Sequence, residues 1–415
     1  MMQKPAGFAG FLLMLLCASN TQAQFSFTET APKGTFVIDS SFIMATVSGA
    51  WDNDKNLGPI IQPDQRYEPT TGELLGTLAP QVEAKTQIWV NVISYGILDS
   101  LTAVVGIPVV VKSSVRPNFE WTPGDVIAQY GRRFDDVRDF WDFAWTFRQP
   151  EVTDWDGNYF VLSDIILGGR YRFTDLFPWF ERNRLAGAMT LYGAIPTGSP
   201  PDPEEVVSMG TTTWSLHFQG ELGIHVAADY TIPGLDDRLT FGVDSFHEAF
   251  FERRYDTPTG VIHKILLIGE DELVGDTYTI NPGNFYGVAG QIELVPWRGP
   301  TPDTWLSRRV GDQVERFPPL LSLYFRYTHT RFGQTKWEGS GSWHAAWWEY
   351  KDKEEIWQPG YKNILTGMAQ VSLLRLGVPM MVYAGYRNQT WIPGKNFRAA
   401  NVINVGFRVP LAKFW

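Results

Sequence analysis

The stretch WSLHFQGELGIHVAADYTI, residues 214–232, decides the fold. Apolar side chains take every second position from Trp214 to Ile232, and mostly polar or small side chains take the positions between them. A period of two is typical of a strand with two different faces. Strands of soluble proteins average about 5 or 6 residues. A strand that crosses a membrane needs about 9 to 11 residues, with an apolar outer face and aromatic residues at its ends. The length of this run and the aromatic residues at both ends of its apolar face therefore favour a transmembrane strand.

The same alternation recurs along the chain, for example over 82–92 and 403–411. An even strand number is usual for single-chain bacterial barrels, in which short periplasmic turns alternate with long external loops. Most connections here alternate in this way, which places both termini in the periplasm. We therefore predict an all-β fold, a transmembrane antiparallel β-barrel of about twelve strands with long extracellular loops. The strands are expected at 34–46, 82–97, 101–113, 160–173, 185–197, 212–232, 239–254, 277–297, 320–332, 361–375, 380–392 and 400–414.

The first 23 residues have the features of a secretory signal peptide: Lys4, an apolar run from Gly7 to Cys17, and a small residue, Ala23, before the expected cleavage point. We expect 24–33 to be a short periplasmic segment and 34–415 to be the barrel. At the other end, Trp415 is in phase with the apolar face of 403–411, like the terminal aromatic residue of an outer-membrane assembly signal. The expected location is the bacterial outer membrane of a Gram-negative cell, and the expected partners are outer-membrane lipid and the barrel-assembly machinery.

Composition excludes several classes of protein. A net charge of −10 argues against a nucleic-acid-binding protein. The single cysteine excludes a disulfide scaffold and a Cys-based zinc site. His217, Glu221 and His225 are spaced like ligands on a helix. On a strand, residues four positions apart lie roughly 13 Å apart, so we interpret all three as polar lining of a lumen. His329 faces outward, as the catalytic histidine of outer-membrane phospholipases does, but no accompanying Ser and Asn arrangement is evident. No enzyme activity, cofactor or metal is expected.

Charged side chains of both signs are expected to face the lumen. Anionic positions are Glu221, Asp229, Asp244, Glu248 and Glu293, and Lys112 adds a cation. Such a mixture does not indicate an ion-selective pore. One interpretation is a salt-bridged network that stiffens the barrel, and the other is a path for solute. The candidate residues of that path are Arg170, Arg172, His217, Glu221, His225, Arg326, Arg387 and Arg408.

Two loops are rich in aromatic residues. Apolar residues of 124–145 recur at steps of three and four, which predicts an amphipathic helix. This helix is expected either to plug or cover the barrel mouth and offer an aromatic binding shelf, or only to shield the strands. The loop 333–360 is rich in tryptophan, which indicates either a binding surface or interfacial aromatic residues. The candidate loop aromatics are Tyr130, Phe134, Trp141, Trp145, Trp343, Trp347 and Trp348.

Three stretches carry a family resemblance: YGILDSL at 95–101 followed by Gly-Ile-Pro at 106–108, DIILGGRYR at 164–172, and AIPTG at 194–198. Their order and separation resemble those of the outer-membrane family named after the meta-pathway of phenol degradation. The resemblance implies a barrel similar in style to channels for hydrophobic compounds, with motifs that form turns and not catalytic sites.

The leading hypothesis is therefore an outer-membrane channel or facilitator for small hydrophobic or aromatic compounds, with such a compound as a possible ligand. The alternative is a non-conducting structural or surface-interaction barrel whose lumen is filled, and an outer-membrane enzyme is a third class. Conductance measurements with and without residues 124–145 would distinguish the first two.

Overall fold

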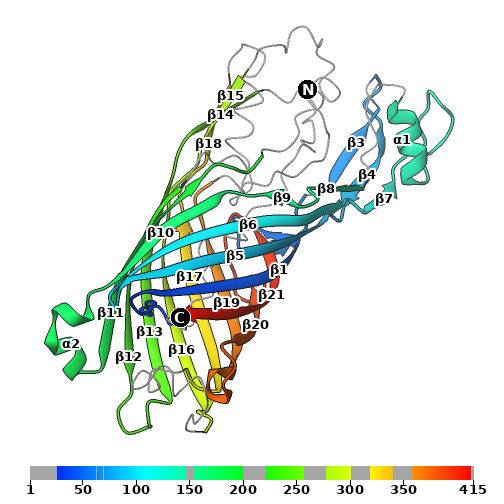
Figure 1. Ribbon diagram of the computed structural model, residues 1–415. Coiled ribbons are helices and arrows are strands. Elements are labelled where there is room, and N and C mark those ends of the chain that lie inside the picture. The colour runs from blue at the N-terminus through cyan, green and yellow to red at the C-terminus, as the bar shows by residue number, and fades with distance from the viewer. Residues whose placement is uncertain are drawn as a thin grey trace.

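The computed structural model describes residues 26–61, 63–68, 70–145, 154–199, 221–256, 277–300, 318–339 and 358–412. Its central feature is a closed antiparallel barrel of 12 strands (Figure 1). Closure comes from the pairing of β6 with β10, from Gly106↔Ile166 to Leu101↔Tyr171. Around the barrel the strands are β10 (Ile165–Arg172), β11 (Leu185–Ile195), β12 (Glu221–Thr231), β13 (Leu239–Phe250), β16 (Phe285–Trp297), β17 (Leu321–Phe332), β19 (Gly360–Ser372), β20 (Met381–Asn388), β21 (Phe397–Ala412), β1 (Thr35–Trp51), β5 (Glu83–Leu98) and β6 (Leu101–Arg116).

The predicted fold class and strand number are confirmed, but several strand bounds differ. The predicted strand 239–254 ends in the wall at Phe250, where β13 (Leu239–Phe250) stops. The predicted strand 277–297 is two strands, because β15 (Thr277–Asn281) leaves the wall and only β16 belongs to it. β15 pairs instead with β14 (Arg253–Asp256) and β18 (Lys336–Gly339) in a separate three-stranded sheet. Part of the predicted strand 212–232 lies outside the described residues, and β12 is described from Glu221 onward.

The outer face of the barrel is apolar, as the alternation predicts. Leu222, Val226, Ile403 and Val405 are each 46–49% exposed and project outward. Exposed aromatic side chains stand near both ends of the strands: Phe36, Tyr95, Tyr230 and Phe241 at one end, Tyr286, Tyr386 and Trp391 at the other. Strands that close on themselves satisfy their backbone hydrogen bonds internally, which hydrocarbon requires. In the part of the chain that the structure describes, no helix is long and apolar enough to span a membrane.

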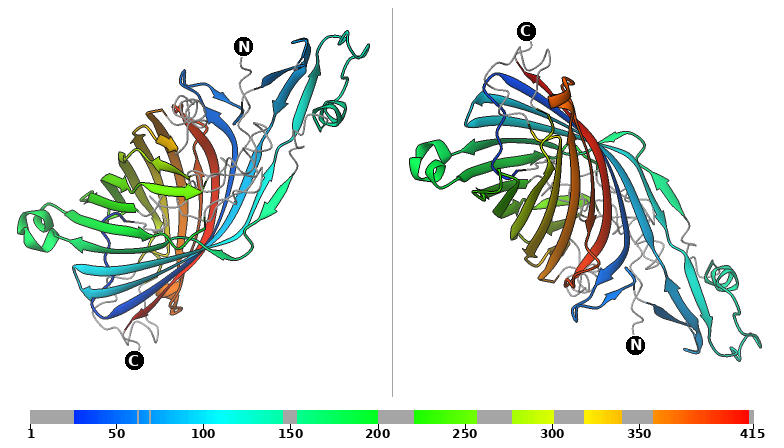
Figure 2. Two further views of the ribbon diagram at one scale, coloured as in Figure 1. Left: turned by 90° about the horizontal axis from the view of Figure 1, so that it is seen from above. Right: turned by 90° about the horizontal axis from the view of Figure 1, so that it is seen from below.

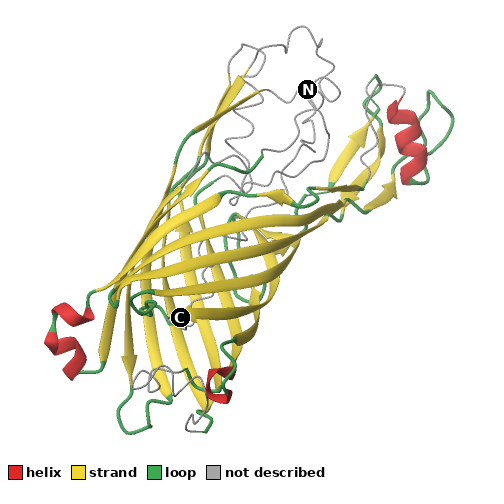
Figure 3. Ribbon diagram, in the orientation of Figure 1, coloured by secondary structure: helices red, strands yellow, loops and turns green. Residues whose placement is uncertain are grey.

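The two ends of the barrel differ. One end, here called the turn end, carries most of the short connections: the turn at 99–100 and short helices, namely η2 (Thr174–Leu176), α2 (Pro178–Arg182) and η6 (Leu373–Leu376). The opposite end, the loop end, carries most of the long connections and the two small sheets (Figure 3). Short strands line the wall there: β2 (Leu57–Gly58) pairs with β1, and β8 (Trp155–Gly157) and β9 (Val161–Leu162) pair with β6.

The predicted helix 124–145 belongs to a small unit beside the loop end, here called the outer module. It consists of β3 (Asp64–Tyr67), β4 (Leu74–Pro80), β7 (Phe119–Pro123) and α1 (Val137–Trp145). The helix is shorter than predicted, because residues 124–134 form turns and a β-bridge from Ile127 to Arg132. Figures 1 and 2 show α1 to one side of the barrel, on the opposite side from α2. In this position α1 does not cross the lumen.

A buried carboxylate orders the β3–β4 turn of the outer module. Burial opposes ionisation of Glu68, but hydrogen bonds from the backbone N–H groups of Thr71 and Thr70 and from the Tyr130 hydroxyl outweigh it. The pKa of Glu68 is therefore lowered from its ordinary value. The charged form of Glu68 stabilises this turn.

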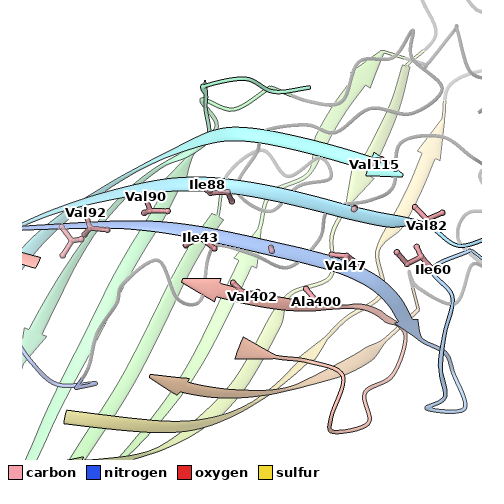
Figure 4. Close-up of a cluster of buried hydrophobic side chains, with 13 residues drawn as sticks. Ile43, Val47, Ile60, Val82, Ile88, Val90, Val92, Val115, Ala400 and Val402 are labelled. Carbon is pink, nitrogen blue, oxygen red and sulfur yellow. The ribbon is translucent and has the colours of Figure 1, made fainter. Parts of the chain in front are cut away.

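The apolar face of β5 points into the barrel, whereas the apolar face of β12 points outward. The apolar set of β5, which includes Ile88, Val90 and Val92, faces inward and is buried, while Trp89 is 46% exposed on the outer face. An analogy with 214–232 would have placed the apolar set outside. The reason lies in the partners: these side chains cluster with Ile43 of β1 and with loop residues such as Ile60 (Figure 4). Here the apolar side chains of the inner wall pack on one another and on loop residues.

The family-like motifs have structural roles. Asp164 accepts a hydrogen bond from the Gly198 N–H at 2.8 Å, and the Thr197 hydroxyl donates to the Ser163 carbonyl at 2.6 Å. The second and third motifs thus join across the loop ends of β10 and β11. In the first motif, a Cβ on Gly96 would lie 2.0 Å from the Pro32 carbonyl oxygen. Glycine at 96 therefore lets the N-terminal segment pass close to the wall.

Candidate functional site

The lumen brings together most of the charged residues that the sequence placed there. Inward positions follow from strand register: Arg170 on β10, Arg326 on β17 and Arg408 on β21 each point to the inside, and Arg172 and Arg387 share their phase. His225 is also inward, opposite Phe246. His217 lies outside the described residues, and Glu221 is described only in its backbone, at the inward-facing start of β12.

The best-defined cluster joins three strands near the turn end. The Arg408 guanidinium donates to Asp39 Oδ2 from Nε at 3.0 Å and from Nη2 at 2.9 Å. The Tyr383 hydroxyl donates to Asp39 Oδ1 at 2.5 Å. Both oxygens of the Asp39 carboxylate are thus engaged, so this cluster ties β1, β20 and β21 together.

A second cluster surrounds His225 on β12. Its Nδ1 lies 2.9 Å from Asp244 Oδ2, and its ring stacks on Phe246 with centroids 5.2 Å apart. The Tyr192 hydroxyl donates to Glu248 Oε1 at 2.9 Å. These contacts fit the interpretation of a polar network that stiffens the wall. Among the described residues no group of three or more His, Cys, Asp or Glu side chains could hold a metal ion.

The N-terminal segment 26–31 lies inside the lumen, which corrects the expectation that 24–33 is a periplasmic segment. Asp229 Oδ2 on β12 accepts hydrogen bonds from the Ser26 hydroxyl at 2.7 Å, the Thr28 hydroxyl at 2.7 Å and the Thr28 N–H at 3.1 Å. Further along, the Ala31 N–H donates to the Thr102 hydroxyl of β6 at 2.8 Å. The segment therefore crosses the turn half of the lumen before it enters β1, and it is drawn dark blue beside β13 in Figure 1.

Glu29 and its backbone meet two of the predicted arginines. Arg170 Nη1 donates to the Glu29 carbonyl oxygen at 3.4 Å, and Arg408 Nη1 lies 3.9 Å from Glu29 Oε2. Arg170 also donates from Nε to the Thr190 hydroxyl at 2.8 Å. The candidate arginines of the solute path thus hold the segment that occupies that path.

Phe27 is the apolar anchor of the segment, with 6% of its surface exposed. It clusters with Ala227 of β12 and Ala289 of β16. The Arg326 guanidinium carbon lies 4.4 Å from the centre of the ring. Gly242 of β13 completes the surroundings, because a Cβ there would lie 2.7 Å from the Phe27 ring. We call these surroundings the Phe27 site.

The lumen wall changes character along its length. On β1, Val47, Ala45 and Ile43 are buried on the inner face toward the loop end, and Ser41 and Asp39 follow toward the turn end. Buried apolar side chains, most of them in the loop half, form one cluster across four neighbouring strands: Ile43, Ala45, Val47, Ala84, Ile88, Val90, Val92, Val104, Val115, Ala400 and Val402. We call this surface the apolar wall. An apolar inner wall is unusual, since the interior of a transmembrane barrel is normally polar.

Two residues of the predicted aromatic shelf are buried. Phe134 is fully buried and Trp141 is 9% exposed, and both belong to the hydrophobic core of the outer module with Leu75 and Leu78. Tyr130 packs edge-on against Phe134 and Phe143. The side chain of Trp145, and Trp343, Trp347, Trp348 and Trp415, lie outside the described residues. The aromatic face of α1 stabilises the module.

The outward histidine, His329, has an asparagine partner that the sequence did not reveal. Its Nδ1 lies 2.8 Å from Asn363 Oδ1 on the neighbouring strand β19. A catalytic histidine of this kind must accept a proton from a nucleophilic hydroxyl. Here Arg331 Nε donates to His329 Nε2 at 3.4 Å instead. The pair therefore does not have the geometry of an activated nucleophile.

These features define a barrel of the outer-membrane type whose lumen is partly filled by its own N-terminal segment. The fold is similar to that of an outer membrane channel from Pseudomonas putida F1, with a TM-score of 0.54 and 9% sequence identity over 94% of this chain and 100% of that chain. Weaker likenesses are to the NanC porin, with a TM-score of 0.34 and 8% identity over 91% of this chain and 99% of that one, and to the monoaromatic hydrocarbon channel CymD, with a TM-score of 0.33 and 7% identity over 93% and 90%.

No protein-family model and no curated protein matches the chain. The resemblance to the phenol-degradation family therefore stays a prediction. At these identities the structural similarity shows the fold.

Proposed function

We propose that this protein is an outer-membrane channel that admits small hydrophobic or aromatic compounds. The observation that carries the proposal is the apolar wall, which begins near the loop end and lies on β21, β1, β5 and β6. A water-filled diffusion pore needs no such wall, whereas an apolar solute gains free energy on leaving water for it, about 25 cal/mol per Å² of buried apolar surface. The loop end is then external and the turn end is periplasmic, so that β1 begins and β21 ends on the periplasmic side.

The orientation rests on general properties of such barrels. Bacterial outer-membrane barrels have short periplasmic turns and longer extracellular loops. The outer module, with its own hydrophobic core, would then stand on the cell surface. Solute would enter at the loop end, follow the apolar wall and leave at the turn end past residues 26–31. Outer-membrane lipid contacts the exposed belt, and the barrel-assembly machinery inserts the chain.

The alternative is a non-conducting barrel, and one observation favours it specifically: the segment 26–31 is anchored to wall residues such as Asp229, Thr102 and Arg170. A permanently seated segment would make the charged lumen a stiffening network and would leave the outer module as the functional surface.

Planar-bilayer recordings on the mature protein separate the two. A channel with an apolar path should pass a small ion current that phenol reduces in a saturable manner. Val92→Thr, which adds a hydroxyl to the apolar wall with little change in volume, should weaken the phenol effect. Val226→Thr, the same substitution on the outer face, should not. A folded protein that passes no current above the protein-free bilayer would support the non-conducting barrel.

A further inference from the structure

We propose that the Phe27 site is a binding site for a single aromatic ring, and that Phe27 occupies it as an intramolecular stand-in for the solute. The inference deepens the proposed channel function and rests on it for its physiological meaning. It assigns the position in the lumen at which an aromatic solute is recognised, and it explains how recognition is coupled to opening.

The site has the dimensions of a ring because small residues surround it. Ala227 and Ala289 contribute only methyl groups, and Gly242 contributes no side chain. A Cβ on Gly242 would meet both the Phe27 ring at 2.7 Å and Asp229 Oδ1 at 2.5 Å. Small residues on three consecutive strands, β12, β13 and β16, therefore leave the space that the ring fills.

A fixed cation gives the site its preference for aromatic over saturated rings. The Arg326 guanidinium carbon is 4.4 Å from the ring centre, well within the range of about 6 Å over which a cation is attracted to an aromatic face. Arg326 is held in place by Gln291, whose Oε1 accepts hydrogen bonds from its Nε at 2.9 Å and its Nη2 at 2.5 Å. Because the guanidinium is oriented before any ligand arrives, the attraction is available to any ring that replaces Phe27.

The hydrogen bonds on either side of Phe27 make its ring compete with a solute ring for the site. Ser26 and Thr28 both bind Asp229, so the ring is presented at a high effective concentration. A solute ring that takes the site must expel Phe27. Expulsion removes the apolar contacts of Phe27 that help to seat the segment, and so shifts the segment toward release from the turn half of the lumen.

The test uses Phe27→Ala in the mature full-length chain, reconstituted in lipid nanodiscs. The probe is 4-fluorophenol, and its binding is followed by fluorine NMR line broadening. The variant should bind the probe saturably, at least about tenfold more tightly than the unchanged protein, in which Phe27 competes. Phenol should displace the probe, and cyclohexanol, its saturated counterpart, should not do so at tenfold higher concentration.

Two double variants test whether the probe binds in the space that Phe27 vacates. Phe27→Ala combined with Gly242→Leu refills the vacated space and should abolish binding. Phe27→Ala combined with Gly290→Leu, at a glycine with nothing within 4 Å of its Cβ position, is the matched control and should bind like Phe27→Ala. Absence of saturable binding to folded Phe27→Ala, equal displacement by cyclohexanol, or unchanged binding after Gly242→Leu would each overturn the proposal.

Conductance of the same samples separates this proposal from the proposed function. If the protein conducts but does not bind the probe, the Phe27 site is refuted and the channel function stands. If the protein binds the probe but never conducts, the ring site stands and the channel function is refuted.

Discussion

The hydrogen bonds to Asp229 make a quantitative prediction about how firmly the N-terminal segment is seated. Asp229→Asn keeps the size and shape of the side chain but removes its charge. Three donors share Oδ2, at 2.7, 2.7 and 3.1 Å. A hydrogen bond to a charged group contributes about 1.5 to 3 kcal/mol and a neutral one about 0.5 to 1.5 kcal/mol, so each bond weakens by roughly 1 kcal/mol.

Because the three bonds converge on one oxygen, their losses do not add fully. We expect the released state of the segment to become more favourable by about 2 to 3 kcal/mol. At 1.4 kcal/mol for each factor of ten, the ratio of released to seated segment rises about 30- to 150-fold.

Hydrogen exchange of the Thr28 amide measures this ratio, since that N–H is protected only while the segment is seated. Exchange should accelerate by the same factor in Asp229→Asn. The control is Asp237→Asn, which removes a carboxylate that pairs with Arg184 and Arg298 in an exposed turn. Equal exchange in Asp229→Asn and the unchanged protein, or equal acceleration in both variants, would show that Asp229 does not hold the segment.

Four further predictions follow from other parts of the molecule. Val226→Arg, on the outer face at the middle of β12, should cost about 2 to 4 kcal/mol of folding stability in lipid, whereas Tyr230→Arg near the strand end should cost about 1 kcal/mol or less; refolding into vesicles in urea measures both. Phe134→Ala, which empties a fully buried position in the outer module, should cost about 3 to 5 kcal/mol, seen as protease cleavage of that module while the barrel stays resistant. The β3–β4 turn should lose protection from hydrogen exchange as the pH falls below about 4.3. The reason is that the charged carboxylate of Glu68, whose pKa is lowered in the folded turn, stabilises the turn and the protonated form does not. Glu68→Gln should remove this pH dependence. Deletion of Trp415 should reduce insertion into the outer membrane without affecting secretion, and normal insertion would contradict the assembly signal.

Local patterns account for the parts of the structure that the sequence predicted correctly. Alternation of side chains is a property of each strand alone, so the twelve strands, the outward face of 403–411 and the inward arginines at 170, 326 and 408 followed from period and composition. Closure of the barrel then followed from strand number and connection lengths, since an open edge has no place in hydrocarbon.

Only the tertiary structure decided what fills the lumen. Ser26 and Asp229 are 203 positions apart, and nothing in the period of either segment indicates that they meet. The same holds for β5, whose alternation was evident but whose inward apolar face depends on loop residues such as Ile60, and for α1, whose aromatic face is buried by β4 and β7. A period of two or of 3.6 shows that an element has two different faces. Which partner covers the apolar face depends on contacts between residues far apart in the chain, and these form only when the barrel closes.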